Sequence, residues 1–381
     1  MIARSSPRIG FRGLSLAAAF LAVVSTARAA EFHFPPAGAT ADWATIDAAA
    51  AGFDAGKLAE VLDFARRRRS SSLVILYRGR IVAEGNWNPN DVADGKVATT
   101  KARGYEARML GRDAAGRAIE DVASAQKSVS AILCGMAQAK GLLDIDDAAD
   151  KYLGAGWTKA TREQEAAITV RHLLTMTSGL DDGLAYEAPP GTRWYYNSTA
   201  YSRVLECAAA AAKLDRNEMT SEWLTGPIGM LDSRWEERKI PEGFVLPAGF
   251  EPKNMVGFAT TARDLARFGL LIAAGGDWEG RPIITDKKYL FDATHPSQDL
   301  NPSYGYLWWL NGQPKVMRGR QLIDGPLIRT APADLIAALG GFQRKLYVVP
   351  SRELVVTRLG DNCAPPDVEL WRLIEAARLS K

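Results

Sequence analysis

Strand-like segments lie near both ends of this chain, while the middle has helical patterns. Each end carries two β-rich segments separated by a short turn-forming stretch, which is typical of a β-hairpin. The segments are residues 73–77 and 80–84, separated by Arg78-Gly79, and residues 345–349 and 353–359, separated by Pro350-Ser351-Arg352. This arrangement favours one sheet built from the two ends of the chain, with the central segment inserted between them.

Helical spacing or composition marks the centre of the chain. The helical segments are residues 124–140, 201–213 and 261–274, and a last helix closes the chain around residues 370–377. We predict an α/β fold in which an antiparallel sheet built from both chain ends is flanked by helices and carries an inserted, mostly helical domain. The expected boundaries are 30–120 and 281–381 for the discontinuous α/β domain and 121–280 for the helical domain, with a surface excursion over residues 86–120.

The first 29 residues have the pattern of a secretory signal. Arg4, Arg8 and Arg12 precede an apolar run over residues 14–24, and the small-residue stretch Ala27-Arg28-Ala29 follows it. The alternative is an N-terminal membrane anchor, but this run is only about half of the ~20 residues that span a bilayer. We therefore expect a mature chain that starts at Ala30, is periplasmic or secreted, and has no stable membrane anchor.

The charge balance indicates no polyanionic partner. The chain has 47 basic and 44 acidic residues and a net charge of +3, which is too even to indicate nucleic acid binding. We expect a small-molecule or peptide substrate as the partner. The sequence carries no signal for an oligomeric state.

Three cysteines, an odd number, allow at most one disulfide bond. They are Cys134, Cys207 and Cys363, and the first two lie within helical patterns. Because a free cysteine behaves as a small apolar residue, we expect Cys134 and Cys207 to be buried thiols.

The strongest chemical motif is Ser124-Ala125-Gln126-Lys127-Ser128, at the start of an apolar helical pattern. The spacing places Ser124 and Lys127 on neighbouring points of one helical turn. A serine hydroxyl needs a base to remove its proton, and a charged lysine cannot be that base. Burial and the positive end of the helix dipole both disfavour the ammonium form, and the same dipole favours a developing oxyanion near the Ser124 N–H.

This motif, with Ser128 and Ser130, resembles the first motif of the β-lactamase/penicillin-binding protein superfamily, especially its class C β-lactamase, D-alanyl-D-alanine carboxypeptidase and esterase branch. Further segments resemble family landmarks in the same order along the chain, from about residue 73 to about residue 360. They are residues 168–174 leading into 177–180, residues 190–198, residues 256–266 and residues 304–309. The resemblance implies that Ser124 is the nucleophile, that Lys127 helps to activate it, and that catalysis passes through an acyl-enzyme.

The family's Tyr-x-Asn motif has two possible registers here, within Pro190-Gly191-Thr192-Arg193-Trp194-Tyr195-Tyr196-Asn197-Ser198. Counting from Thr192 places Tyr196 on the family's tyrosine and Ser198 on its asparagine. A shift of one residue gives Tyr195-Tyr196-Asn197 instead. We favour Tyr196, which by the family's logic shares the proton transfer with Lys127 and protonates the leaving group. The alternative is an aromatic cluster that only packs on the core.

The third motif departs from the family pattern of Lys-Thr-Gly or His-x-Gly. Here Ala338 stands where the family has a basic residue or a histidine, while Gly340 is retained. A glycine there lets a substrate approach the backbone closely, although a strand glycine can also mark only a bulge. By resemblance, the N–H of Gly341 completes the oxyanion hole. The missing cation weakens the case for substrates with a carboxylate beside the reacting carbonyl, and leaves esters and neutral amides open.

Other catalytic chemistries fit the sequence poorly. A Ser-His-Asp enzyme needs a suitably placed histidine, and the three histidines are His33, His172 and His295. Of these, His172 lies in an apolar helical run and fits a core position. Paired zinc ligands and phosphate-binding glycine loops are missing from the sequence, so we expect neither a metal nor a cofactor.

The sequence therefore predicts a serine hydrolase that acts on a short ester, an amide, a β-lactam or a D-alanyl peptide. The alternative from another class is a non-catalytic penicillin-binding sensor, because a fold does not fix a function. A sensor would keep its acyl adduct, whereas an enzyme would hydrolyse it.

Overall fold

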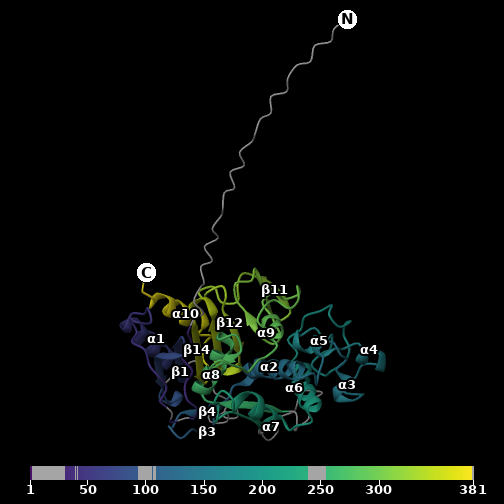
Figure 1. The fold of residues 1–381 in the computed structure, drawn as a ribbon, viewed down its shortest axis with the longest axis horizontal. Helices are drawn as coiled ribbons and strands as arrows, with labels where there is room; N and C mark the ends of the chain where they lie inside the picture. The colour runs from purple at the N-terminus through teal and green to yellow at the C-terminus, as the bar shows by residue number, and fades with distance from the viewer. Residues whose placement is uncertain are drawn as a thin grey trace. The chain divides into compact units, whose positions relative to one another are not determined.

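The main sheet of the computed structural model has six antiparallel strands, and its centre joins the two ends of the chain (Figure 1). The strand order is β2-β1-β14-β13-β12-β9. The strands are β1 (Ser70–Tyr77), β2 (Arg80–Asn86), β9 (Trp309–Leu310), β12 (Ile336–Leu339), β13 (Lys345–Val349) and β14 (Leu354–Gly360). Strand β1 pairs with β14 in a register that runs from Ser70 opposite Gly360 to Tyr77 opposite Leu354. The predicted sheet from both chain ends is confirmed.

The structure describes Met1 and residues 31–38, 40, 42–92, 105, 109–238 and 255–379. The predicted signal segment 1–29 lies outside the described residues apart from Met1. All elements given below belong to the unit that begins at Phe32. No helix of the described residues is long and apolar enough to cross a bilayer.

Both predicted hairpins are present. Arg78 and Gly79 have φ angles of 49° and 77°, and two such residues in a row are the mark of the tight turn that matches strand twist. A Cβ on Gly79 would lie 1.9 Å from the His33 carbonyl oxygen, so the turn requires glycine. In the second hairpin, Glu353 adopts the left-handed conformation, with φ 53°.

Helices cover both faces of the main sheet. Helices α1 (Ala55–Arg67) and α10 (Asp367–Ala376) contact each other on one face, and α8 (Ala262–Ala273) packs on strands β1, β13 and β14 on the other. Alternate residues of β1 enter different cores: Leu73 and Ile75 pack with α1 and α10, whereas Val74 and Leu76 pack with α8. The strands are therefore apolar on both sides, which explains their continuous hydrophobic runs.

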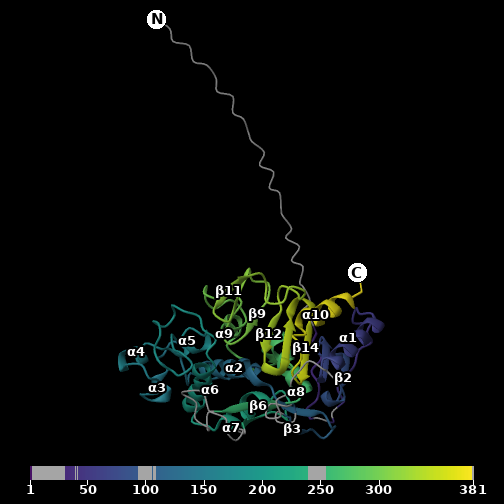
Figure 2. The ribbon, with the colours of Figure 1, turned by 180° about the vertical axis from the view of Figure 1, so that it is seen from behind.

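The central part of the chain is mostly helical, as predicted, and its helices lie at the end of the sheet away from α1 (Figures 1 and 2). The helices are α2 (Gln126–Ala139), α3 (Asp150–Leu153), α4 (Arg162–Ala166), α5 (Val170–Leu174), α6 (Ser198–Ala212), α7 (Arg216–Thr220) and α9 (Lys287–Ala293). Helix α2 is buried along nearly its whole length and packs against α6. Cys134 of α2 and Cys207 of α6 are buried free thiols, as predicted, and Cys363 is also free.

A second sheet, of order β3-β4-β6-β5, was not expected from the sequence. Its strands are β3 (Met109–Arg112), β4 (Ala118–Asp121), β5 (Arg234–Glu237) and β6 (Val256–Thr260). They are only four or five residues long, and the charged residues of β5 hide its pattern. Strand β4 ends three residues before Ser124, so the stretch predicted as a surface excursion over 86–120 ends in a strand that leads into the site.

The remaining elements are short connections. They are β7 (Asp277–Trp278), β8 (Arg281–Pro282), β10 (Lys315–Arg318), β11 (Gln321–Asp324), a π-helical turn over Ser221–Thr225, and 3₁₀ turns over Pro89–Asp91, Ala123–Ala125, Gly341–Gln343 and Pro350–Arg352. The predicted division into domains at 120/121 and 280/281 stays a prediction.

Candidate active site

Ser124 lies in the 3₁₀ turn that connects β4 to α2. The predicted helix began near Ser124, but the α-helix itself starts at Gln126. The preceding residue, Ala123, has φ 51°, a conformation that is sterically costly for a residue with a side chain. The Asp121 carboxylate accepts a hydrogen bond from the Ala123 N–H at 2.8 Å. Strain held in place by neighbours in this way is typical of functional turns.

Lys127, the second residue of α2, points back at the serine. Its Nζ donates a hydrogen bond to Ser124 Oγ at 2.8 Å, and the side chain is buried, with 2% exposure. Among the described residues, no carboxylate forms an ion pair with Lys127. Burial, with a smaller contribution from the nearby charge of Arg238, holds the pKa of Lys127 well below that of an ordinary lysine. The geometry therefore favours a neutral amine beside the serine hydroxyl.

Tyr196 is the tyrosine that the structure brings to this pair. Its ring centroid lies 4.7 Å from Lys127 Nζ, and the Ser124 side chain lowers the pKa of its hydroxyl by less than burial raises it. Burial raises the pKa of Tyr196, so the phenol keeps its proton at neutral pH. The ring also stacks on Trp309 and meets Trp194 and Tyr304. The aromatic cluster proposed as an alternative thus exists, and it holds the tyrosine in position.

The neighbouring tyrosine faces elsewhere. The Tyr195 hydroxyl donates to Asp182 Oδ2 at 2.6 Å in an exposed contact. Asn197 is likewise occupied: its Oδ1 caps α6 by accepting from the N–H groups of Thr199 and Ala200, which is a common use of asparagine at a helix start. Ser198, the first residue of α6, lines the same cavity as Ser124. This geometry fits the register with Tyr196 and Ser198.

Gly340 and Gly341 follow strand β12 and lie beside the 3₁₀ turn that contains Ser124. A Cβ on Gly340 would be 2.2 Å from the Val122 carbonyl oxygen, so the glycine makes room for the chain that carries Ser124. The sequence predicts, instead, that this glycine makes room for the substrate. Gly341 is exposed and lines the cavity. Ala338 is buried, with 1% exposure, and adds no polar group.

Gln126 and Arg238 were not predicted as site residues. The Gln126 side chain donates to Tyr201 Oη at 2.7 Å and accepts from Phe258 N at 3.0 Å. It also accepts from Arg238 Nη2 at 3.1 Å, and the Arg238 guanidinium forms a two-nitrogen ion pair with Asp121. The position of Gln126 between Ser124 and Lys127 could have indicated a place in the site. Arg238 follows β5, and no motif in the sequence indicates its role.

Ser124 and Lys127 line a cavity of about 250 Å³, whereas Tyr196 and Gly340 are not part of its wall. It is lined by Ala123, Ser124, Gln126, Lys127, Ser130, Ser198, Tyr201, Ser202, Leu205, Trp235, Arg238, Val256, Gly341 and Phe342. Within the described ranges, no group of three or more histidine, cysteine or acidic residues could hold a metal ion. His172 is not in this wall: its Nδ1 accepts from the Thr169 N–H at 3.1 Å, which fits the satisfied structural role predicted for it.

The fold is shared with several solved hydrolases. A Bacillus anthracis protein provisionally named a 6-aminohexanoate-dimer hydrolase is 16% identical, with a TM-score of 0.60 over 91% of this chain and 89% of the other. A β-lactamase/D-alanine carboxypeptidase from Pseudomonas syringae is 16% identical, with a TM-score of 0.57 over 85% and 98%. EstCE1, a hydrolase with promiscuous acyltransferase activity, is 14% identical, with a TM-score of 0.57 over 84% and 98%.

No curated protein sequence matches the chain significantly. The family model named Beta-lactamase, however, matches residues 56–377. This range contains Ser124, Lys127, Tyr196 and the glycines after β12. The chain therefore belongs to the β-lactamase family.

Proposed function

We propose that this protein is a serine hydrolase that cleaves an ester or a neutral amide through a covalent acyl-enzyme on Ser124. The observation that carries the proposal is the 2.8 Å contact between Lys127 Nζ and Ser124 Oγ. It is made by a buried lysine that forms no ion pair with any carboxylate of the described residues. An amine in this position can take the serine proton as the oxygen attacks a carbonyl carbon.

The pKa directions divide the proton transfers between two residues. Because burial lowers the pKa of Lys127, the neutral amine is available as the base. Because burial raises the pKa of Tyr196, its phenol is available as the acid that protonates the leaving group, and the Lys127 ammonium then passes the serine proton on to the Tyr196 oxygen. Ser124 is hydrogen-bonded to Lys127 and its side chain also acts on the pKa of Tyr196, which supports a position of both residues beside the same reacting oxygen.

The oxyanion of the tetrahedral intermediate would lie between two backbone N–H groups, those of Ser124 and Gly341. Both residues line the active-site cavity, and a Cβ on Gly341 would be 3.7 Å from the Cβ of Ala123. This proximity supports a pair of donors beside Ser124. Donors that are fixed before the reaction stabilise the developing charge without reorganisation.

The absence of a basic group at Ala338 supports a substrate without a carboxylate next to the scissile bond. The names of the solved relatives include a 6-aminohexanoate-dimer hydrolase and a hydrolase with promiscuous acyltransferase activity, which supports acyl-transfer chemistry. We further propose that the chain is exported and starts at Ala30 once the predicted signal is removed. N-terminal sequencing of the mature protein would check this start, and an intact Met1 would contradict it.

Mass spectrometry with a serine-directed fluorophosphonate tests the mechanism. The wild-type chain should gain one adduct on the peptide that contains Ser124, and Ser124→Ala should gain none there. An adduct on another serine would overturn the assignment. Following the adduct left by a p-nitrophenyl ester separates enzyme from sensor, because an enzyme loses its acyl group within the turnover time and a sensor keeps it.

A further inference from the structure

A second, larger cavity opens beside the active-site cavity. It has a volume of about 670 Å³, and Ser202, Leu205 and Val256 line both spaces. We call it the distal cavity. Helix α6 connects the two, because Ser198 at its start lines the active-site cavity while Arg203 and Glu206 line the distal one. Arg203 lies five positions after Ser198, a rise of about 7.5 Å along the helix axis.

The walls of the distal cavity are partly apolar. Leu153, Trp157, Leu184, Leu205 and Leu214 contribute side chains to it. Such a wall suits a hydrocarbon chain, because apolar surface gains by leaving water. The polar groups of the cavity then decide what the end of that chain carries.

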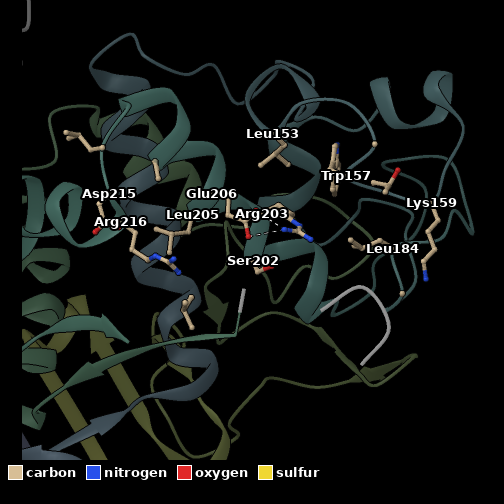
Figure 3. A pocket seen from close by; sticks show the side chains of 16 residues that line it. Leu153, Trp157, Lys159, Leu184, Ser202, Arg203, Leu205, Glu206, Asp215 and Arg216 are labelled. Atoms are coloured by element: carbon tan, nitrogen blue, oxygen red, sulfur yellow. Dashed lines mark hydrogen bonds and ion pairs between the residues drawn. The ribbon is translucent and has the colours of Figure 1, made fainter. Parts of the chain in front are cut away.

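Cations outnumber carboxylates in the wall of the distal cavity. The charged residues there are Lys159, Arg203, Arg216, Glu206 and Asp215. Glu206 is already neutralised by Arg203, whose Nη1 donates to both carboxylate oxygens, at 2.7 and 3.0 Å. Asp215 caps α7 by accepting from the Asn217 N–H. Within the described part of the chain, Lys159 and Arg216 form no side-chain hydrogen bond or ion pair. Figure 3 shows the Arg203–Glu206 pair between them, with Lys159 on one side and Arg216 on the other.

Two N–H donors in the same wall also have no acceptor among the residues that the structure describes. They are Arg203 Nε and Trp157 Nε1, and both are buried. Buried donors are nearly always satisfied, so an unsatisfied pair indicates a missing partner. Unpaired cations and unsatisfied donors both call for an oxygen-rich, anionic group.

Resting on the function proposed above, we infer that the distal cavity binds the far end of an elongated ester or amide substrate, and that this end carries a carboxylate. An apolar spacer would lie against Leu205 and Val256, which line both cavities, and the carboxylate would contact the cations of the distal cavity. This position is distinct from the one beside Ala338, where the carboxylate would adjoin the scissile bond.

Matched esters test the inference in two arms. On the acyl side, mono-p-nitrophenyl suberate is compared with p-nitrophenyl octanoate; on the alcohol side, 8-acetoxyoctanoate is compared with octyl acetate. At least one carboxylate ester should have a kcat/KM about tenfold or more above its neutral partner, since a charge-assisted contact contributes at least about one factor of ten. Equal turnover within both pairs would overturn the inference.

Lys159→Gln and Arg216→Gln identify the cations. At least one of them should bring the carboxylate-to-neutral ratio toward one, and an unchanged ratio in both would also overturn the inference. Arg372→Gln is the matched control, because Arg372 lies on α10 and pairs with Glu369, three residues before it, on the surface. That variant should keep the wild-type ratio.

A binding measurement separates this inference from the proposed mechanism. If wild-type protein hydrolyses none of the esters, the proposed function fails. Calorimetry of suberate binding to Ser124→Ala then still tests the cavity. Binding that weakens about tenfold or more in Lys159→Gln or Arg216→Gln supports the inference, and no binding, or binding that is unchanged in both, contradicts it.

Discussion

Two of the buried cations, Arg344 and Lys127, have different surroundings. Arg344 is fully buried, and its Nε donates to Glu120 Oε2 at 3.0 Å in a fully buried ion pair. Lys127 is almost as buried but faces a hydroxyl and two aromatic rings. A buried cation that is paired with a carboxylate keeps its charge and holds neighbouring segments together. Burial without a carboxylate lowers the pKa of an amine, and the neutral amine can then act as a base.

The Glu120–Arg344 pair connects the parts that frame the site. Glu120 belongs to β4, four residues before Ser124, and Arg344 follows the turn that contains Gly341. Glu120 also accepts from Tyr105 Oη at 3.0 Å and from the Gly360 N–H at 3.1 Å. This ion pair therefore joins strand β4, which leads to Ser124, and the turn after β12 in one buried network.

Removing the proposed base, Lys127, should have the largest effect. Lys127→Ala should lower kcat/KM for a p-nitrophenyl ester by about 10³-fold or more, because general-base catalysis contributes up to about 10⁴-fold. The fold should persist, since no counter-ion is left unpaired. Near-UV circular dichroism and turnover of the same sample check both statements, and a fully active variant would contradict the role of the amine.

Removing the carboxylate of the structural pair should act on stability first. Glu120→Gln leaves the Arg344 charge buried without a partner, which should cost about 3–5 kcal/mol in the free energy of unfolding. Urea denaturation measures this cost. The double variant Glu120→Gln, Arg344→Met should recover part of the loss, because it removes the stranded charge. Equal stability of Glu120→Gln and wild type would contradict the structural role.

The two adjacent tyrosines give a matched pair for the proton transfers. Tyr196→Phe should lower kcat/KM by about 10²-fold, the lower range of general-acid catalysis. Tyr195→Phe loses only an exposed hydrogen bond with Asp182 and should change kcat/KM by less than about twofold. Steady-state kinetics of the two variants decide between them. The reverse order of effects would move the motif to the other register.

The pH dependence of stability follows from the lowered pKa of Lys127. Below the ordinary lysine pKa, the unfolded chain binds a proton on Lys127 that the folded chain does not hold. The free energy of unfolding should therefore rise with pH between the lowered pKa in the folded state and the ordinary value of about 10.4. Lys127→Met should remove this part of the slope. Chemical denaturation at several pH values measures it, and identical slopes would show that the folded chain keeps the lysine charged.

The sequence predicted the parts of this molecule that repeat a simple pattern. The two hairpins, helix α2 and the Ser124–Lys127 contact follow from alternation, helical spacing and one short motif. The second sheet did not, because its strands are too short to show a period. Arg238 also could not be predicted, since β5 brings it to Asp121 from more than a hundred residues away. Backbone strain at Ala123 was hidden for a different reason: alanine carries no mark of a left-handed conformation.

Relieving the backbone strain at Ala123 should have the smallest effect on stability and turnover. Ala123 keeps φ 51° next to Ser124, so Ala123→Gly should relieve about 1 kcal/mol of steric cost, partly offset by the greater entropy of glycine in the unfolded chain. Lys213→Gly is the control, because Lys213 has φ 55° at the exposed end of α6. Both variants should gain up to about 1 kcal/mol of stability in urea denaturation. Only Ala123→Gly should also lower kcat/KM, by less than about tenfold, because the freed turn holds the serine less firmly against Lys127. Equal kinetics in the two variants would mean that the strain at Ala123 belongs to the connection between β4 and α2 and not to the chemistry.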